Sequence, residues 1–173
     1  AKGKSFYLLT DNGSRQSLFR LDVKTNKIHA IDAKEDVVRG FSVASAGNTF
    51  YYFGQSLNNA DRLYSLEPSG KSKLIWDISA EKLRGVKFTP AKDFIYRTPD
   101  GVDIDGWYYL PPNFDPAKKY PMIVYYYGGT LPLSRELETT YDLAMFAAQG
   151  YVAYSLNPRG TVGYGQAFAG EHL

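Results

Sequence analysis

The sequence predicts two kinds of structure in succession: part of a β-propeller, of about two blades, followed by the first part of an α/β domain. A strand pattern repeats in the first half, and a strand–helix–strand order follows in the second. Composition changes between them, because residues 1–93 carry a net charge of +5 and residues 94–173 a net charge of −3, and 11 of the 15 tyrosines follow residue 93. We therefore assign residues 1–90 to the blades and residues 91–173 to the α/β part.

The blade prediction depends on a repeat of short β-prone segments. The expected strands cover residues 5–10, 17–22, 27–32, 49–54, 62–67 and 73–77. Phe6 and Phe50 are 44 residues apart, and Ile28 and Leu74 are 46 apart. A period of 40–50 residues with three or four strands per unit is typical of propeller blades, whereas meandering hairpins would share no common period. A propeller closes with about 4–8 blades, so we expect most of the ring to lie outside these residues.

The second half begins with an expected hairpin, residues 93–97 and 102–110, about a Pro-Asp-Gly turn. Residues 120–127 form an almost continuous apolar run, which predicts a parallel strand buried on both faces. Another such strand is expected at 151–156. Because a connection between parallel strands usually contains a helix, these segments indicate the start of an α/β domain.

The helix of this crossover is expected between residues 137 and 148. Leu137, Tyr141, Met145 and Ala148 recur at helical spacing and form one apolar face. Thr139 and Asp142 have the spacing of a capping box, and Gly150 is placed to end the helix. Residues 157–165, Asn-Pro-Arg-Gly-Thr-Val-Gly-Tyr-Gly, are expected to form a glycine-rich loop.

Composition excludes several classes of function. The chain has no cysteine, and His29 and His172 are its only histidines, so thiol chemistry and a multi-histidine metal site are excluded within it. A net charge of +2 gives no support for nucleic-acid binding. No apolar run approaches the 18–20 residues of a membrane span. We therefore expect no metal, no cofactor, no nucleic-acid partner and no membrane-spanning segment.

Motifs for nucleophilic and phosphate chemistry are incomplete. The Gly-x-Ser-x-Gly turn of α/β hydrolases is absent, and its nearest approach, residues 40–44, lies among strands with no helix behind it. Residues 70–72 have only the end of a phosphate-binding loop, and Gly163-Tyr-Gly165 lacks the third glycine of a dinucleotide fingerprint. Asp103 and Asp105 lie on one side of a strand, where we interpret them as a solvated face.

Three tyrosines stand at the carboxyl end of the first parallel strand, directly before Gly128 and Gly129. Ligands of open α/β sheets bind at the carboxyl ends of strands, and paired glycines let the backbone turn tightly there. Tyr125 and Tyr126 are interpreted as core residues. For Tyr127, packing in the core and donation of a hydrogen bond to a developing oxyanion both stay open.

The order of these motifs resembles the prolyl oligopeptidase family of serine peptidases, most closely its dipeptidyl-peptidase IV and acylaminoacyl-peptidase types. The residues that carry the resemblance are Thr98–Gly101, Gly106–Pro112, Tyr120–Gly129, Phe146–Tyr151 and Asn157–Phe168. The match is strong from about residue 94 onward and generic in the blades.

The resemblance implies a propeller stacked on an α/β-hydrolase domain, with a Ser-Asp-His triad that cleaves short peptides, often after proline or alanine. Tyr127 matches the tyrosine that completes the oxyanion hole of the family, and Gly128 and Gly129 match the turn that positions it. Thr130 and Arg159 match loops at the substrate cleft, where Arg159 is expected to be structural. The implied partners are a short peptide substrate and the remainder of the same polypeptide. Family habit favours export, for example to a bacterial periplasm.

One departure from the family pattern is large. The chain starts at Ala1 and stops at Leu173, before the positions at which the family carries its triad. We therefore expect an excerpt that is inactive alone. Two alternatives stay open: a propeller-based binding protein with an inert hydrolase domain, and an esterase. A Gly-x-Ser-x-Gly further along the parent sequence would favour an enzyme, and a comparison of peptide and ester substrates would separate peptidase from esterase.

Overall fold

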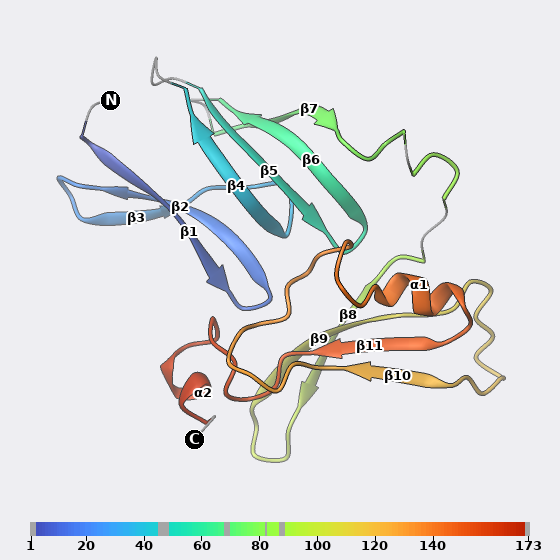
Figure 1. Ribbon diagram of the computed structural model, residues 1–173. Coiled ribbons are helices and arrows are strands. Elements are labelled where there is room, and N and C mark those ends of the chain that lie inside the picture. The colour runs from blue at the N-terminus through green and yellow to red at the C-terminus, as the bar shows by residue number, and fades with distance from the viewer. Residues whose placement is uncertain (1–2, 45–48, 68–69, 82, 87–88, 172–173) are drawn as a thin grey trace.

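The computed structural model describes residues 3–44, 49–67, 70–81, 83–86 and 89–171. Their elements form two β-sheets and two short helices (Figure 1). The elements are β1 (Ser5–Asn12), β2 (Arg15–Asp22), β3 (Lys27–Ala30), β4 (Val37–Val43), β5 (Phe50–Ser56), β6 (Asn59–Leu66), β7 (Ser72–Asp77), β8 (Lys92–Arg97), β9 (Asp103–Tyr109), β10 (Met122–Tyr125), α1 (Leu143–Ala148), β11 (Val152–Leu156) and α2 (Gln166–Gly170).

The first sheet consists of two antiparallel meanders, β1–β2–β3 and β4–β5–β6–β7. A single parallel bridge between Gln16 and Val37 joins them, and the sheet does not close on itself. All six strands expected from the repeat are present, as β1, β2, β3, β5, β6 and β7. The sequence prediction missed β4, which begins with the buried pair Val37 and Val38, β-branched residues that favour a strand.

The second sheet has the order β10-β11-β9-β8 (Figure 1). β10 and β11 are parallel, and α1 lies between them in the chain, as the sequence predicted. β9 pairs antiparallel with both β11 and β8, so the expected hairpin of residues 93–97 and 102–110 is confirmed.

The helix is shorter than the sequence predicted. It begins at Leu143, because the Asp142 carboxylate caps it by accepting hydrogen bonds from the backbone N–H groups of Ala144, at 2.9 Å, and Met145, at 3.2 Å. The capping box of Thr139 with Asp142 was therefore wrong. The expected end at Gly150 is confirmed, since this residue has a φ of 96°, a left-handed conformation that glycine adopts at little cost.

Strand β10 is less buried than predicted. Met122 is 56% exposed and Val124 is 49% exposed, because no described element covers their face of the strand. Ile123 and Tyr125, on the opposite face, are half-buried, and Tyr125 packs against the core of the second sheet. The prediction of a strand buried on both faces was therefore wrong for β10 within the described residues.

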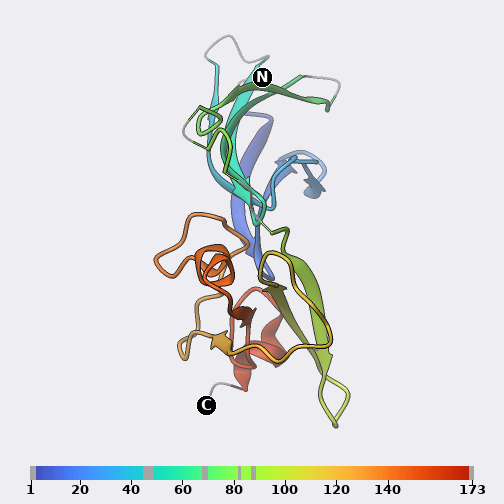
Figure 2. The same cartoon turned by 90° about the vertical axis from the view of Figure 1, so that its right-hand side faces the viewer.

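The first sheet lies above the second along the long axis of the molecule (Figure 2). The turn between β5 and β6 reaches into the core of the second sheet, where Leu57 and Ala60 pack with Trp107 and Tyr109. The Tyr109 hydroxyl donates a 2.9 Å hydrogen bond to the Leu57 carbonyl. Burial of a side chain such as Leu57 contributes about 1.5–3 kcal/mol, so this turn anchors the first sheet to the second.

Neither described helix is long and apolar enough to cross a membrane.

Candidate functional site

Two loops meet at the carboxyl edge of the parallel pair β10 and β11. The first, residues 126–133, follows β10 and is called the Tyr127 loop here; the second, residues 157–165, follows β11 and is the glycine-rich loop. The Val162 N–H donates a 2.8 Å hydrogen bond to the Thr130 carbonyl and joins them. This edge is where ligands of open α/β sheets bind, so the contact places both loops at a candidate site.

Tyr127 lies two residues beyond the end of β10, and its side chain is 48% exposed. Its ring lies against Gly129: a Cβ atom at Gly129 would stand 2.8 Å from Cζ and 3.0 Å from the hydroxyl of Tyr127. A Cβ atom at Gly128 would meet nothing within 4 Å. Within the described part of the chain the Tyr127 hydroxyl has no hydrogen-bond partner, so it is free to donate to a bound group.

A cavity of about 290 Å³ adjoins the Tyr127 loop, between the second sheet and residues 132–143. Its lining combines aromatic rings, carboxylates and hydroxyls, contributed among others by Trp107, Tyr109, Tyr125, Tyr141, Glu136 and Ser155. The Ser155 hydroxyl is buried and has no hydrogen-bond partner among the residues the model describes. Glu136 forms an ion pair with Arg39 of the first sheet, at 3.5 Å, so the first sheet contributes a charge beside the cavity.

Asn157, the first residue after β11, holds the far end of the Tyr127 loop. Its side-chain oxygen accepts a 2.7 Å hydrogen bond from the Leu133 N–H, and its side-chain nitrogen donates to the Leu133 carbonyl at 3.0 Å. The same nitrogen donates to the Tyr164 hydroxyl at 2.9 Å. Asn157 is 1% exposed, so these bonds satisfy its buried amide and fix its orientation.

The glycine-rich loop is also tied to the first sheet. The Tyr164 hydroxyl donates to Asp105 at 2.8 Å, and the Ser14 hydroxyl donates to the same carboxylate oxygen at 2.6 Å. Burial and the hydrogen bond to Asp105 raise the pKa of Tyr164 above its ordinary value. Next to this contact, the Gly13 N–H donates to the Gly163 carbonyl at 2.8 Å.

The solvated face expected for Asp103 and Asp105 was therefore wrong for Asp105, whose carboxylate lies between the two sheets. Asp103 is exposed and pairs with Arg97 at 2.7–2.8 Å.

Arg159 is engaged with the turn between β8 and β9. Its guanidinium donates to both carboxylate oxygens of Asp100 at 2.5 Å, to the Thr98 hydroxyl at 3.1 Å and to Glu171 at 2.9 Å. The hydrogen bonds from Arg159 and then from Thr98 lower the pKa of Asp100 to about 2. Thr130 therefore contacts the glycine-rich loop, whereas the side-chain contacts of Arg159 among the described residues go to Thr98, Asp100 and Glu171 and not to the Tyr127 loop.

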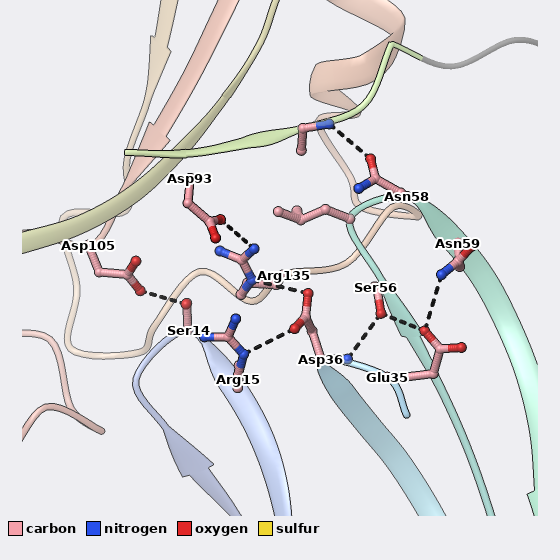
Figure 3. Close-up of polar contacts among 12 residues, drawn as sticks. Ser14, Arg15, Glu35, Asp36, Ser56, Asn58, Asn59, Asp93, Asp105 and Arg135 are labelled. Carbon is pink, nitrogen blue, oxygen red and sulfur yellow. Dashed lines mark hydrogen bonds and ion pairs between the residues drawn. The ribbon is translucent and has the colours of Figure 1, made fainter. Parts of the chain in front are cut away.

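A buried arginine that sequence reasoning missed connects the site to the first sheet. The Arg135 guanidinium bonds to Asp36 at 3.1 Å and to Asp93 at 2.6 Å (Figure 3), and it lies 5.6 Å from the centre of the Trp107 ring. Arg15 reaches the other oxygen of Asp36 at 3.0 Å. The partners of Arg135 are 99 and 42 residues away in the chain, so no local motif signals them.

The remaining sequence candidates lie elsewhere. His29 is an exposed residue of β3 opposite Arg20. Ser42 lies within β4, with no helix directly after it, as expected. His172 lies outside the described residues.

Comparisons with known proteins agree with this architecture. No protein-family model matches the chain. The chain is 30% identical over 167 residues to dipeptidyl-peptidase 5 of Porphyromonas gingivalis, covering 94% of this chain and 24% of that protein. Its fold is similar to that of the acylaminoacyl peptidase of Pyrococcus horikoshii, with a TM-score of 0.81, 22% identity and coverage of 98% of this chain and 26% of that one. Its fold is also similar to that of dipeptidyl peptidase 4 of Porphyromonas gingivalis, with a TM-score of 0.71 and 17% identity. The match covers 97% of this chain and 26% of that one.

In fold, the chain is thus similar to a part of a prolyl-oligopeptidase-family peptidase, an enzyme in which a propeller accompanies an α/β-hydrolase domain. In sequence, its homologues are peptidases, with dipeptidyl-peptidase 5 among them, and the resemblance stated above is confirmed. The chain spans about a quarter of the length of the relatives it matches.

Proposed function

We propose that the protein carrying this chain is a serine peptidase that hydrolyses peptide bonds of short peptides, and that Tyr127 donates a hydrogen bond to the oxyanion of the tetrahedral intermediate. Residues 1–90 contribute two propeller blades, and residues 91–173 contribute the first part of the hydrolase domain. The nucleophile and its histidine and aspartate partners come from outside these 173 residues, which contain no Gly-x-Ser-x-Gly motif.

One observation carries the role of Tyr127. Its ring is held against Gly129 just beyond the carboxyl end of a parallel strand, while its hydroxyl has no partner among the described residues. A donor that already points at the position of a developing charge needs no reorganisation during the reaction. Thr130 and Leu133, further along the loop, are both hydrogen-bonded to the segment after β11. These bonds hold the backbone of the loop that contains Tyr127.

The proposed chemistry is ordinary acyl transfer. A serine oxygen attacks the carbonyl carbon of the substrate while the histidine takes the serine proton, and the carbonyl π electrons move onto oxygen, where the Tyr127 O–H stabilises the negative charge. The C–N bond then breaks as the electron pair returns, and the histidine gives its proton to the leaving amine. Water attacks the acyl-enzyme in the same way and releases the acid and the serine. Loss of one such donor typically costs about 2.7–4 kcal/mol, or about 10²–10³ in rate. Since the charge exists only after attack, the loss falls on kcat and leaves KM almost unchanged.

The test is Tyr127→Phe in the protein that carries this chain, assayed on a short peptide amide. We expect kcat to fall by about 10²–10³, with KM within about threefold of the parent value. Tyr126→Phe is a matched control. Tyr126 stands one position earlier, and its expected place in the core was wrong, since it is 59% exposed. Its kcat should be unchanged. An unaltered kcat in Tyr127→Phe would remove Tyr127 from the mechanism.

The same preparation separates the remaining functions. A fluorophosphonate reagent labels the activated serine of a peptidase or an esterase, and it leaves a binding protein with an inert hydrolase domain unlabelled. A peptidase turns over both the peptide amide and the matched ester, whereas an esterase turns over the ester alone. Labelling without amide turnover would therefore contradict the proposed peptidase.

A further inference from the structure

The Tyr127 loop is anchored at both ends to the same strand. At its start, β10 pairs in parallel with β11 through residues 122–125 and 152–155. At its end, Leu133 is bonded through both its N–H and its carbonyl to the side chain of Asn157, directly after β11. Asn157 therefore fixes the position of the end of the loop relative to β11, the strand with which β10 pairs.

Asparagine suits this position chemically. Its side-chain amide has one acceptor, the oxygen, and one donor group, the nitrogen. It can therefore accept a hydrogen bond from the N–H of a residue and donate one to the carbonyl of the same residue, as a neighbouring strand does in a sheet. Asn157 is 1% exposed, and loss of its amide would leave the N–H and the carbonyl of the half-buried Leu133 without these partners. Leaving a buried polar group unpaired costs about 1–3 kcal/mol, which the loop can avoid only by moving.

We propose that Asn157 is a positioning residue for Tyr127: through Leu133 it holds the loop in the conformation that presents the tyrosine hydroxyl to the oxyanion. The inference rests on the proposed function of Tyr127. The inference also extends the proposed function, because it assigns a role to a second residue. Asn157 would touch no reacting atom and would affect the rate only by positioning the Tyr127 side chain.

The third contact of Asn157 provides a matched control. Its side-chain nitrogen also bonds the Tyr164 hydroxyl, which belongs to the contact with Asp105 and Ser14. Tyr164→Phe removes that contact but leaves both bonds to Leu133 in place. If Asn157 acts by holding the Tyr127 loop, Tyr164→Phe should keep kcat within about threefold of the parent, even where it lowers stability.

The experiment is a double-mutant cycle in the protein that carries this chain, with kcat and KM measured for the parent, Tyr127→Phe, Asn157→Ala and the double variant. We expect Asn157→Ala to lower kcat by about 10–10² with KM nearly unchanged, since a misplacement of about 1 Å can cost 10²-fold. In the Tyr127→Phe background, the same substitution should change kcat by less than about threefold, because the group it positions is already absent.

The failures are distinguishable. An equal drop in both backgrounds, or no drop in the parent background, overturns the role of Asn157 and leaves that of Tyr127 intact. An unchanged kcat in Tyr127→Phe alone overturns the proposed function instead. Circular dichroism and thermal unfolding establish that each variant is folded. If Asn157→Ala does not fold, Asn157→Asp replaces it: the carboxylate still accepts from the Leu133 N–H but donates to nothing, and the same non-additivity is expected.

Discussion

The ring of Tyr127 lies directly against Gly129, so close that a methyl group at position 129 would overlap it. Gly129 does not have a positive φ, so the constraint on this residue is one of space and not of backbone conformation. The neighbouring Gly128 has open space around the corresponding position. Of these two adjacent glycines, only Gly129 is required by the tyrosine.

Gly129→Ala should therefore displace the Tyr127 ring. If Tyr127 has the role proposed for it, kcat of the protein that contains this chain should fall by about 10–10², because the hydroxyl is displaced from the place where it would meet the oxyanion. Gly128→Ala is the control and should stay within about threefold of the parent. Steady-state kinetics on one peptide substrate check both, and equal values for the two alanine variants would contradict the steric relationship.

The ion pairs of the buried Arg135 should contribute measurably to stability. Arg135→Met leaves Asp36 and Asp93 without this partner, and removal of one partner from a fully buried pair costs about 3–5 kcal/mol. Asp93 is well exposed and Asp36 keeps Arg15, so we expect a smaller loss, about 2–3 kcal/mol, in the free energy of unfolding by urea. Arg97→Met removes an exposed pair with Asp103 and should cost at most about 1 kcal/mol. A larger loss for Arg97→Met than for Arg135→Met would refute this assignment.

A buried carboxylate in the first sheet makes a second stability test. Glu35 accepts a 2.6 Å hydrogen bond from the Tyr64 hydroxyl and a 2.5 Å bond from the Ser56 hydroxyl. Tyr64→Phe removes one donor from a buried charge and should lower the free energy of unfolding by about 1–3 kcal/mol. Tyr51→Phe is the control, because among the described residues the Tyr51 hydroxyl has no hydrogen-bond partner and its side chain is 38% exposed. Urea unfolding curves with equal midpoints for both variants would exclude the predicted role of Tyr64.

The ion pair of Arg159 and Asp100 should appear in the acid stability of the protein. The pKa of Asp100 is lowered from 3.8 to about 2 in the folded state, by the hydrogen bonds from Arg159 and Thr98. A carboxylate with a lowered folded-state pKa adds stability above its unfolded-state pKa, and this contribution is lost as the pH falls through the folded-state value. In Asp100→Asn, stability should therefore fall less steeply than in the parent between about pH 4 and pH 2. The free energy of unfolding measured from pH 2 to pH 5 gives the comparison, and parallel curves would contradict the prediction.

Periodicity predicted most of the strands, because local patterns of apolar residues decide where a strand forms. The segments that contain Phe6, Ile28, Phe50 and Leu74 form β1, β3, β5 and β7, as expected. The parallel pair β10 and β11 was likewise predicted from two apolar runs with a helix between them. The start of α1 was not, since Leu137 and Tyr141 have helical spacing but precede the residue that caps the helix, Asp142.

The contacts around the candidate site depended on the tertiary structure. Tyr127 and its two glycines could be proposed from the sequence because they are adjacent in the chain and follow a strand, and their role stays a prediction. Asn157 was noted only as part of a motif, because its partner Leu133 is 24 residues away. For Arg135 and Asp105, the partners in the first sheet are more than 90 residues away. A single sequence has no signal for such distant polar pairs, whereas apolar spacing is visible within a few residues.

The polar pairs between the two sheets limit which segments of related proteins could replace one half of this chain in a chimera. Two side-chain hydrogen bonds join the first half of the chain to the second: Ser14 to Asp105, and Arg135 to Asp36. The Gly13 N–H also donates a 2.8 Å hydrogen bond to the Gly163 carbonyl. A chimera that joins the first ninety residues to the matching C-terminal segment of a relative would therefore need, in that segment, the partners of Ser14 and Asp36 and a glycine opposite Gly13. Crossover points for such chimeras are better chosen by these matched pairs than by the linker between the sheets.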